Sequence, residues 1–315
     1  MRFRVEAWDP EYGTASEPEP ATAAEPARVD VEIAAHRWAP IAPHGALAEP
    51  VVLFVDGVRR TEAFGWIHGP EDGLNGPDAL DAEPCTFASY AAGIVRCAPG
   101  AATVTACEIG RGVASSAAEL ETVTTSCGEF RPIRTESGAP EHLNTAIQRA
   151  MTAIEVRLSF AARGDDPDAL LVVDGPLRER RHVEHAVGLV KRHHVRYLGE
   201  LDRVVATLGA GERTPVFFIP GSAKLSWYLR LPGPADGPWA GVVRLEAPAE
   251  IARDAVIALA DRTAATLPRY ASAAHKDGRA PQNLYPIGGL ERALRHRLGD
   301  PAFVLRSLRS AAARR

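Results

Sequence analysis

The chain has 315 residues, of which 46% are hydrophobic, which is enough for one large α/β domain or two smaller ones. Its formal net charge of −4 excludes an overall basic field, although residues 178–196 and 292–315 are locally basic. Those basic stretches are compatible with binding a phosphate backbone and equally with solvated helix faces. We recognise neither a signal peptide nor a bilayer-spanning apolar run, and therefore expect a cytoplasmic protein without membrane contact.

The four cysteines are Cys85, Cys97, Cys107 and Cys127. They form no C-x-x-C pair, and no histidine lies at zinc-finger spacing from them. We therefore expect reduced, partly buried thiols and no zinc site.

The first apolar strand of the chain is predicted at Val51–Val55, after a Pro- and Ala-rich arm over residues 1–30. Asp56 and Gly57 follow the strand at once, and this pair favours a tight hairpin turn. Alternating small, β-branched and aromatic residues then predict strands over 86–97 and 103–113, with Gly100 between them. The first part of the chain is thus expected to be a β-meander.

A long helix is predicted over 140–162. Its apolar residues recur at helical spacing, and they are Leu143, Ile147, Met151, Ile154 and Leu158. Glu155 lies one helical turn from Met151 and from Leu158. Its carboxylate therefore falls on the margin of the buried stripe, and we do not expect it to be fully solvated.

A second apolar strand over 168–174 ends, like the first, in Asp-Gly, here Asp174 and Gly175. In a purely structural interpretation, each aspartate is a turn residue. In a functional interpretation, two buried strands place two carboxylates at one edge of a sheet. Further strands are predicted over 186–191, 214–219, 226–231 and 241–245, and further helices over 195–208, 249–267 and 290–298.

This order of elements is the layout of the ribonuclease-H-like α/β architecture, a mixed sheet flanked by helices. In that architecture, carboxylates from the first strand, a helix and a later strand converge on divalent metal ions. Two such ions ~4 Å apart can align the attacking water and the leaving oxygen of a phosphodiester. Their preferred ligands are hard oxygen atoms.

Six stretches in this order resemble the NurA nuclease family: FVDG at 54–57, the helix with Glu155, LLVVDGPL at 170–177, GLVK at 188–191, SWYLRL at 226–231 and LYP at 284–286. The resemblance spans residues 50–295. It implies a DNA nuclease that uses Mn²⁺ or Mg²⁺ and acts on DNA ends. It also implies a homodimer that docks on a hexameric HerA-type ATPase.

Carried over to this chain, the resemblance implies that Asp56, Glu155 and Asp174 bind the metal. It places Lys191 near the substrate phosphate and makes Tyr285 a late active-site tyrosine. The family's late Ala-His pair is absent, because Ala293-Leu294 stands there. His275 is the residue that we expect to substitute for that histidine; His296 is the other candidate.

The expected organisation is an arm over 1–30, a NurA-like nuclease domain over 31–300 and a basic tail over 301–315. The expected function is a metal-dependent deoxyribonuclease. The alternative is a catalytically weak or inactive NurA-like partner that docks on and regulates a HerA-like ATPase, because the late histidine is missing. A sugar-kinase-like ATPase is disfavoured, because no Gly-rich phosphate loop flanks the acids.

Overall fold

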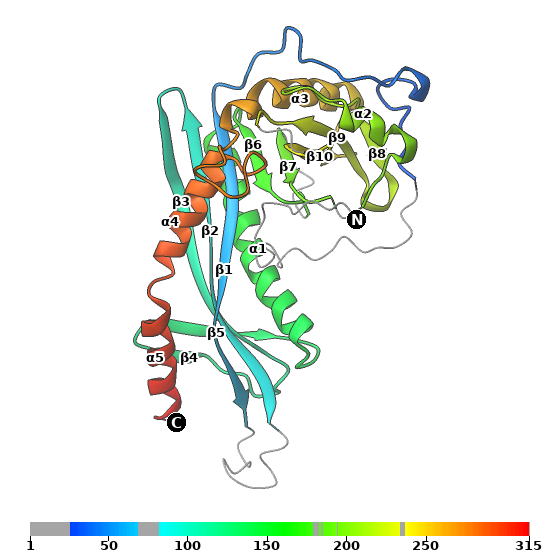
Figure 1. Ribbon diagram of the computed structural model, residues 1–315. Helices are drawn as coiled ribbons and strands as arrows, with labels where there is room; N and C mark the ends of the chain where they lie inside the picture. The colour runs from blue at the N-terminus through cyan, green and yellow to red at the C-terminus, as the bar shows by residue number, and fades with distance from the viewer. Residues whose placement is uncertain are drawn as a thin grey trace. The chain divides into compact units, whose positions relative to one another are not determined.

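The computed structural model describes residues 26–68, 82–178, 183, 185–193, 195–233 and 237–314. Most of the predicted arm over 1–30 therefore lies outside the described residues. The described chain forms a ten-stranded sheet with helices packed against it (Figure 1). None of its helices is long and apolar enough to cross a membrane.

The strands are β1 (Val52–Ile67), β2 (Glu83–Ala98), β3 (Ala101–Ser115), β4 (Val123–Thr125), β5 (Gly128–Arg134), β6 (Leu170–Asp174), β7 (Ala186–Val190), β8 (Phe217–Ile219), β9 (Lys224–Arg230) and β10 (Val242–Pro248). The α-helices are α1 (Pro140–Asp165), α2 (Asp202–Ala206), α3 (Arg253–Thr266), α4 (Tyr285–Arg297) and α5 (Pro301–Ala312).

The sheet has the strand order β4-β5-β3-β2-β1-β6-β7-β10-β9-β8. The strands β1, β6 and β7 run parallel, whereas β10 and β9 pair antiparallel beside them. Parallel neighbours need a long crossover, and α1 lies in the chain between β5 and β6. The predicted α/β class, a mixed sheet flanked by helices, is confirmed.

The chain divides into two compact units, each with its own apolar packing. The first consists of the described residues within Met1–Val55, Val95–Thr103 and Ser159–Gly289. Here β9 is buried along its whole length, because helices cover both of its faces. Trp227 donates a hydrogen bond to Thr263 of α3 (3.2 Å), whereas Tyr228 packs with Val204 and Val205 of α2.

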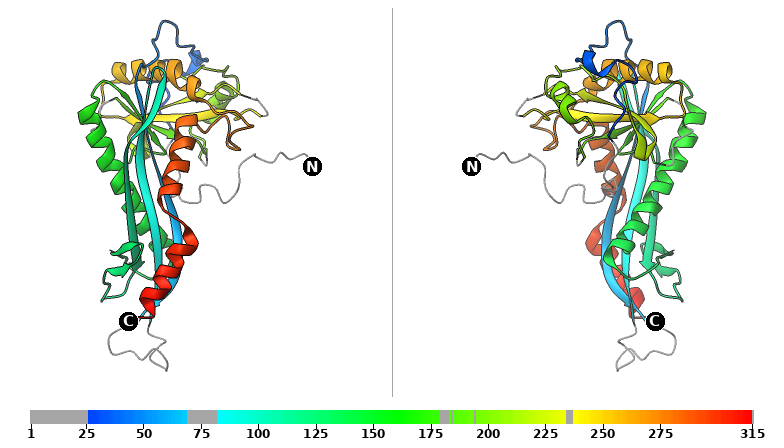
Figure 2. Two further views of the ribbon diagram at one scale, coloured as in Figure 1. Left: turned by 90° about the vertical axis from the view of Figure 1, so that its left-hand side faces the viewer. Right: turned by 90° about the vertical axis from the view of Figure 1, so that its right-hand side faces the viewer.

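The second unit consists of the described residues within Asp56–Ile94, Val104–Leu158 and Leu290–Arg315. Figure 2 shows α1 and α4 on opposite sides of the strands β1 to β3. On one side, Tyr90 packs on the predicted apolar stripe of α1. On the other side, α4 comes so close to Gly93 that an added Cβ would lie 3.1 Å from Leu290 and from Leu294.

The predicted hairpin at Asp56-Gly57 is wrong, because β1 continues without a break to Ile67. Gly57 lacks the positive φ that such a turn requires. The glycine instead permits a close approach, since an added Cβ would lie 2.6 Å from Glu155 Oε1. An Asp-Gly pair is compatible both with a turn and with a close approach of another side chain. Here the packing of α1 against β1 determines that Gly57 has the second role.

Other differences have equally local reasons. The helix predicted over 195–208 is reduced to a 3-10 turn and α2, because Gly199 adopts φ +57°. The strands β4 and β5 were not predicted. The expected tail over 301–315 begins with α5, whose first turn is capped by the side chain of Asp300, which accepts from Phe303 N at 2.9 Å. Val304 and Leu308 of α5 are buried.

Candidate metal centre

Two of the predicted acids lie on neighbouring strands, Asp56 inside β1 and Asp174 as the last residue of β6. Val55 of β1 and Val173 of β6 are partners in the parallel register, and Asp56 and Asp174 are the next residues of the two strands. Because the parallel register pairs Val55 with Val173, the next residues of the two strands come side by side. The two carboxylates therefore lie together, but Asp56 does so from within β1 and not from the end of a strand at the edge of the sheet.

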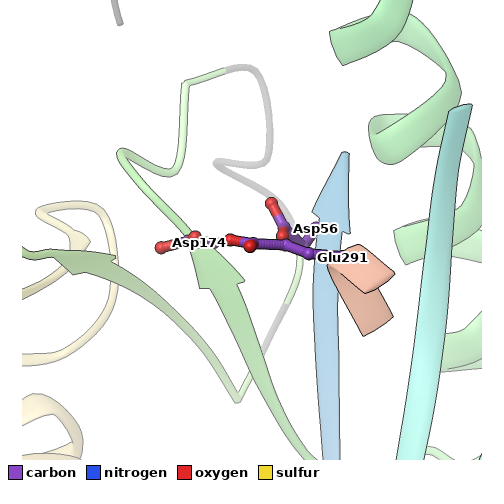
Figure 3. Close-up of side chains that lie close together, drawn as sticks. All are labelled: Asp56, Asp174 and Glu291. Carbon is purple, nitrogen blue, oxygen red and sulfur yellow. The ribbon is translucent and has the colours of Figure 1, made fainter. Parts of the chain in front are cut away.

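A third carboxylate, that of Glu291, joins this pair (Figure 3). Asp56, Asp174 and Glu291 each offer one oxygen, and these three oxygens all lie within 4.8 Å of one another. Asp56 and Glu291 are each 7% exposed, and Asp174 is partly buried. Buried carboxylates this close repel one another unless positive charge lies among them. Their hard oxygen atoms are suitable ligands for Mg²⁺ or Mn²⁺.

Glu291 was not predicted from the sequence. It lies on the buried face of α4 together with Ile287, Leu290 and Leu294. A glutamate on an apolar stripe at helical spacing is the signal that could have identified it. That signal indicates burial, but it does not tell which other acids lie nearby.

Glu155 is not in the group of three. Its side chain is 7% exposed, as expected from its place on the margin of the α1 stripe. Its Oε1 lies against the backbone of Gly57, the residue that follows Asp56. A role of Glu155 as a metal ligand stays a prediction.

Lys191 follows β7 and lies at the site. Its ammonium donates to Asp174 Oδ2 at 2.7 Å and to Asn283 Oδ1 at 2.7 Å. The lysine side chain is only 8% exposed, so both bonds are shielded from water. The ammonium thus places a positive charge in direct contact with one of the three acids.

Tyr285 and His275 are not part of this contact network in the described residues. Tyr285 begins α4, and its hydroxyl accepts from Ala273 N at 3.2 Å. Its ring lies 5.3 Å from the ammonium of Lys276. His275 is an exposed turn residue. Their predicted catalytic roles stay predictions. Two of the arginines in 178–196, Arg180 and Arg181, lie outside the described residues.

Comparisons with known proteins give structural similarities only. No family model and no curated protein sequence matches the chain. The fold is similar to the crystal structure of the NurA nuclease from Sulfolobus solfataricus, with a TM-score of 0.44, 10% identity, and 83% of this chain and 84% of that chain covered. NurA is also the family that the sequence motifs resemble. At 10% identity, the structural similarity concerns the fold alone.

The catalytic domain of human endonuclease V is similar as well, with a TM-score of 0.36, 14% identity, and 86% of this chain and 89% of that chain covered. A further crystal structure of human endonuclease V gives a TM-score of 0.35 at 13% identity and covers 79% of this chain and 84% of that chain.

Proposed function

We propose that the protein is a divalent-metal-dependent nuclease that hydrolyses phosphodiester bonds of DNA. We propose Asp56, Asp174 and Glu291 as the ligands of its metal. The observation that carries the proposal is the approach of three carboxylate oxygens, from β1, β6 and α4, within 4.8 Å of one another. This donor set fits Mn²⁺ or Mg²⁺. When bound, such an ion polarises a phosphoryl oxygen and promotes ionisation of water.

The side chains around the three acids have separate tasks in this proposal. Asp56 and Glu291 would be cation ligands whose burial leaves little water to compete for their oxygens. Asp174, the last residue of β6, would be the third ligand. The ammonium of Lys191 attracts a phosphate oxygen of the backbone as a point charge and carries no sequence preference. Glu155 is a proposed further ligand, because its carboxylate lies beside Gly57.

The choice of DNA as substrate is supported by the sequence resemblance. Action on DNA ends, a homodimer and docking on a HerA-type hexameric ATPase are proposals with the same support. The inactive-partner alternative predicts binding to such an ATPase without DNA cleavage in any divalent metal.

The test is cleavage of linear DNA with Mn²⁺ by the wild type, Asp174→Ala, Asp56→Asn and Glu291→Gln. We expect each substitution to lower the rate by about 100-fold or more, since even the partners that orient metal ligands contribute roughly 10- to 100-fold. Glu62→Gln is the matched control, because Glu62 is also a buried acid of β1 but pairs with Arg60. Equal rates for the wild type and Asp174→Ala would refute the assignment of this site.

A further inference from the structure

The ammonium of Lys191 is held between two acceptors. Its bonds to Asp174 Oδ2 and to Asn283 Oδ1 are both 2.7 Å long. An ammonium has three N–H groups, and these two bonds fix its position along two directions. Within the described residues, one N–H remains for a phosphate oxygen. The placement of Lys191 on Asp174 therefore depends on Asn283 as well.

Asn283 can support Lys191 in one amide orientation only. Its side chain is completely buried, and its Nδ2 donates to Asp277 Oδ2 at 2.7 Å. A carboxylate only accepts and an ammonium only donates. Rotating the amide by half a turn would place its NH₂ against Lys191 and its oxygen against Asp277. Both contacts would then be repulsive, so Asp277 determines that the oxygen faces Lys191.

Asp277 is itself fixed by the segment that carries it. Its Oδ1 accepts from Arg279 N at 2.8 Å and from Arg279 Nε at 3.4 Å. Burial opposes ionisation of Asp277, but the hydrogen bonds from Asn283 and Arg279 outweigh it, and the pKa of the carboxyl lies below its ordinary value. The segment closes on itself through Asn283 N, which donates to Arg279 O at 3.0 Å.

We infer that Asn283 and Asp277 are positioning residues of the site: Asp277 fixes the amide orientation of Asn283, and the Asn283 oxygen holds the Lys191 ammonium on Asp174. The inference rests on the proposed function for the role of Lys191 in binding a phosphate. The contacts themselves join residues that all belong to the first unit.

A spectroscopic test needs neither metal nor substrate. The chain has three lysines, Lys191, Lys224 and Lys276, so ¹⁵N-lysine labelling gives at most three side-chain ammonium signals in NMR. The Lys191 signal is the one that disappears in Lys191→Met. We expect it to shift or to be lost through faster hydrogen exchange in Asn283→Leu and in the isosteric Asp277→Asn.

Asp277→Asn is the sharper of the two variants, because an amide cannot accept from Arg279 and from Asn283 with both of its ends. The control is Thr214→Val, which removes a buried hydroxyl that accepts from Tyr228 N at 3.0 Å in another part of the first unit. This control should leave the Lys191 signal unchanged. An unchanged Lys191 signal in both Asn283→Leu and Asp277→Asn would overturn the inference.

A kinetic test separates positioning from general damage to the fold. With Mn²⁺ and linear DNA, Asp277→Asn should lower kcat/KM by about tenfold, the size expected for one misplaced charge-assisted hydrogen bond. In the Lys191→Met background, the same substitution should change nothing further, because its effect passes through Lys191. An equal fall in both backgrounds would overturn the inference and leave the nuclease proposal intact. Cleavage that does not depend on Asp174 would overturn the nuclease proposal, whatever the Lys191 signal does.

Discussion

Replacing Gly188 with alanine tests the packing of the strand next to the proposed site. Gly188 lies in the middle of β7, where its register partners are Val173 of β6 and Glu246 of β10. An ideal Cβ at this position would lie 2.8 Å from Gly175 O and 2.9 Å from both Leu177 N and Glu246 Cγ. Real Cβ atoms essentially never approach other atoms closer than 3.0 Å, so a neighbour must move.

Two of these three atoms belong to the backbone that leaves β6 directly after Asp174. Its displacement would disturb the 2.8 Å hydrogen bond from Leu177 N to Glu246 Oε1. Overpacking costs about 1–3 kcal/mol, and loss of a hydrogen bond to a charged group about 1.5–3 kcal/mol. We therefore expect Gly188→Ala to lower the free energy of unfolding by roughly 3–5 kcal/mol.

Urea unfolding followed by far-UV circular dichroism measures this difference. Gly164→Ala is the matched control, since an added Cβ at Gly164 of α1 would meet nothing within 4 Å. Alanine is favoured over glycine inside a helix, so the control should gain about 0.5–1 kcal/mol. A Gly188→Ala protein within about 0.5 kcal/mol of the wild type would refute the packing argument, since ordinary surface substitutions have effects of that size.

Two further predictions concern titrating groups. Burial raises the pKa of Cys85 and of Cys97 to about 11, so both thiols should resist iodoacetamide in the native protein at neutral pH and react in urea, as measured by mass spectrometry. Native labelling at the rate seen in urea would contradict this. Asp277 has a folded-state pKa below its unfolded value of about 3.9, so its contribution to stability is present above that pH and is lost as the pH falls through the folded-state value. In Asp277→Asn, the melting temperature should therefore fall less steeply below the unfolded-state pKa than in the wild type. Parallel curves of melting temperature against pH for the two proteins would show that Asp277 does not contribute to this fall.

Local sequence patterns are sufficient to predict the two strands that carry Asp56 and Asp174. The apolar runs before Asp56 and Asp174 predict buried strands because a short β-rich run ending in Asp-Gly has few other solutions. The apolar residues from Leu143 to Leu158 recur at helical spacing, and this spacing predicts α1. The parallel register then follows from the architecture, and it places the two aspartates side by side.

The rest of the site depends on packing between distant parts of the chain. Glu291 reaches Asp56 and Asp174 only because of where α4 lies, and nothing in its neighbouring residues encodes that place. The Asp56-Gly57 pair fits a turn and a close approach equally well until α1 is present. Asn283 is an ordinary loop residue in the sequence, and its importance to Lys191 becomes visible only when both are placed.

The spacing of the three acids has a consequence for protein synthesis. Asp174 follows Asp56 by 118 positions, and Glu291 follows Asp174 by 117. The strands β2 and β3 and the helix α1 can begin to form from local contacts while the ribosome is still translating, whereas the pairing of β1 with β6 must wait for distant residues. A nascent or truncated chain that stops before Glu291 lacks one of the three proposed ligands. A metal-dependent activity at this site would therefore arise only after Glu291 has been added, when all ten strands of the sheet have already been synthesised.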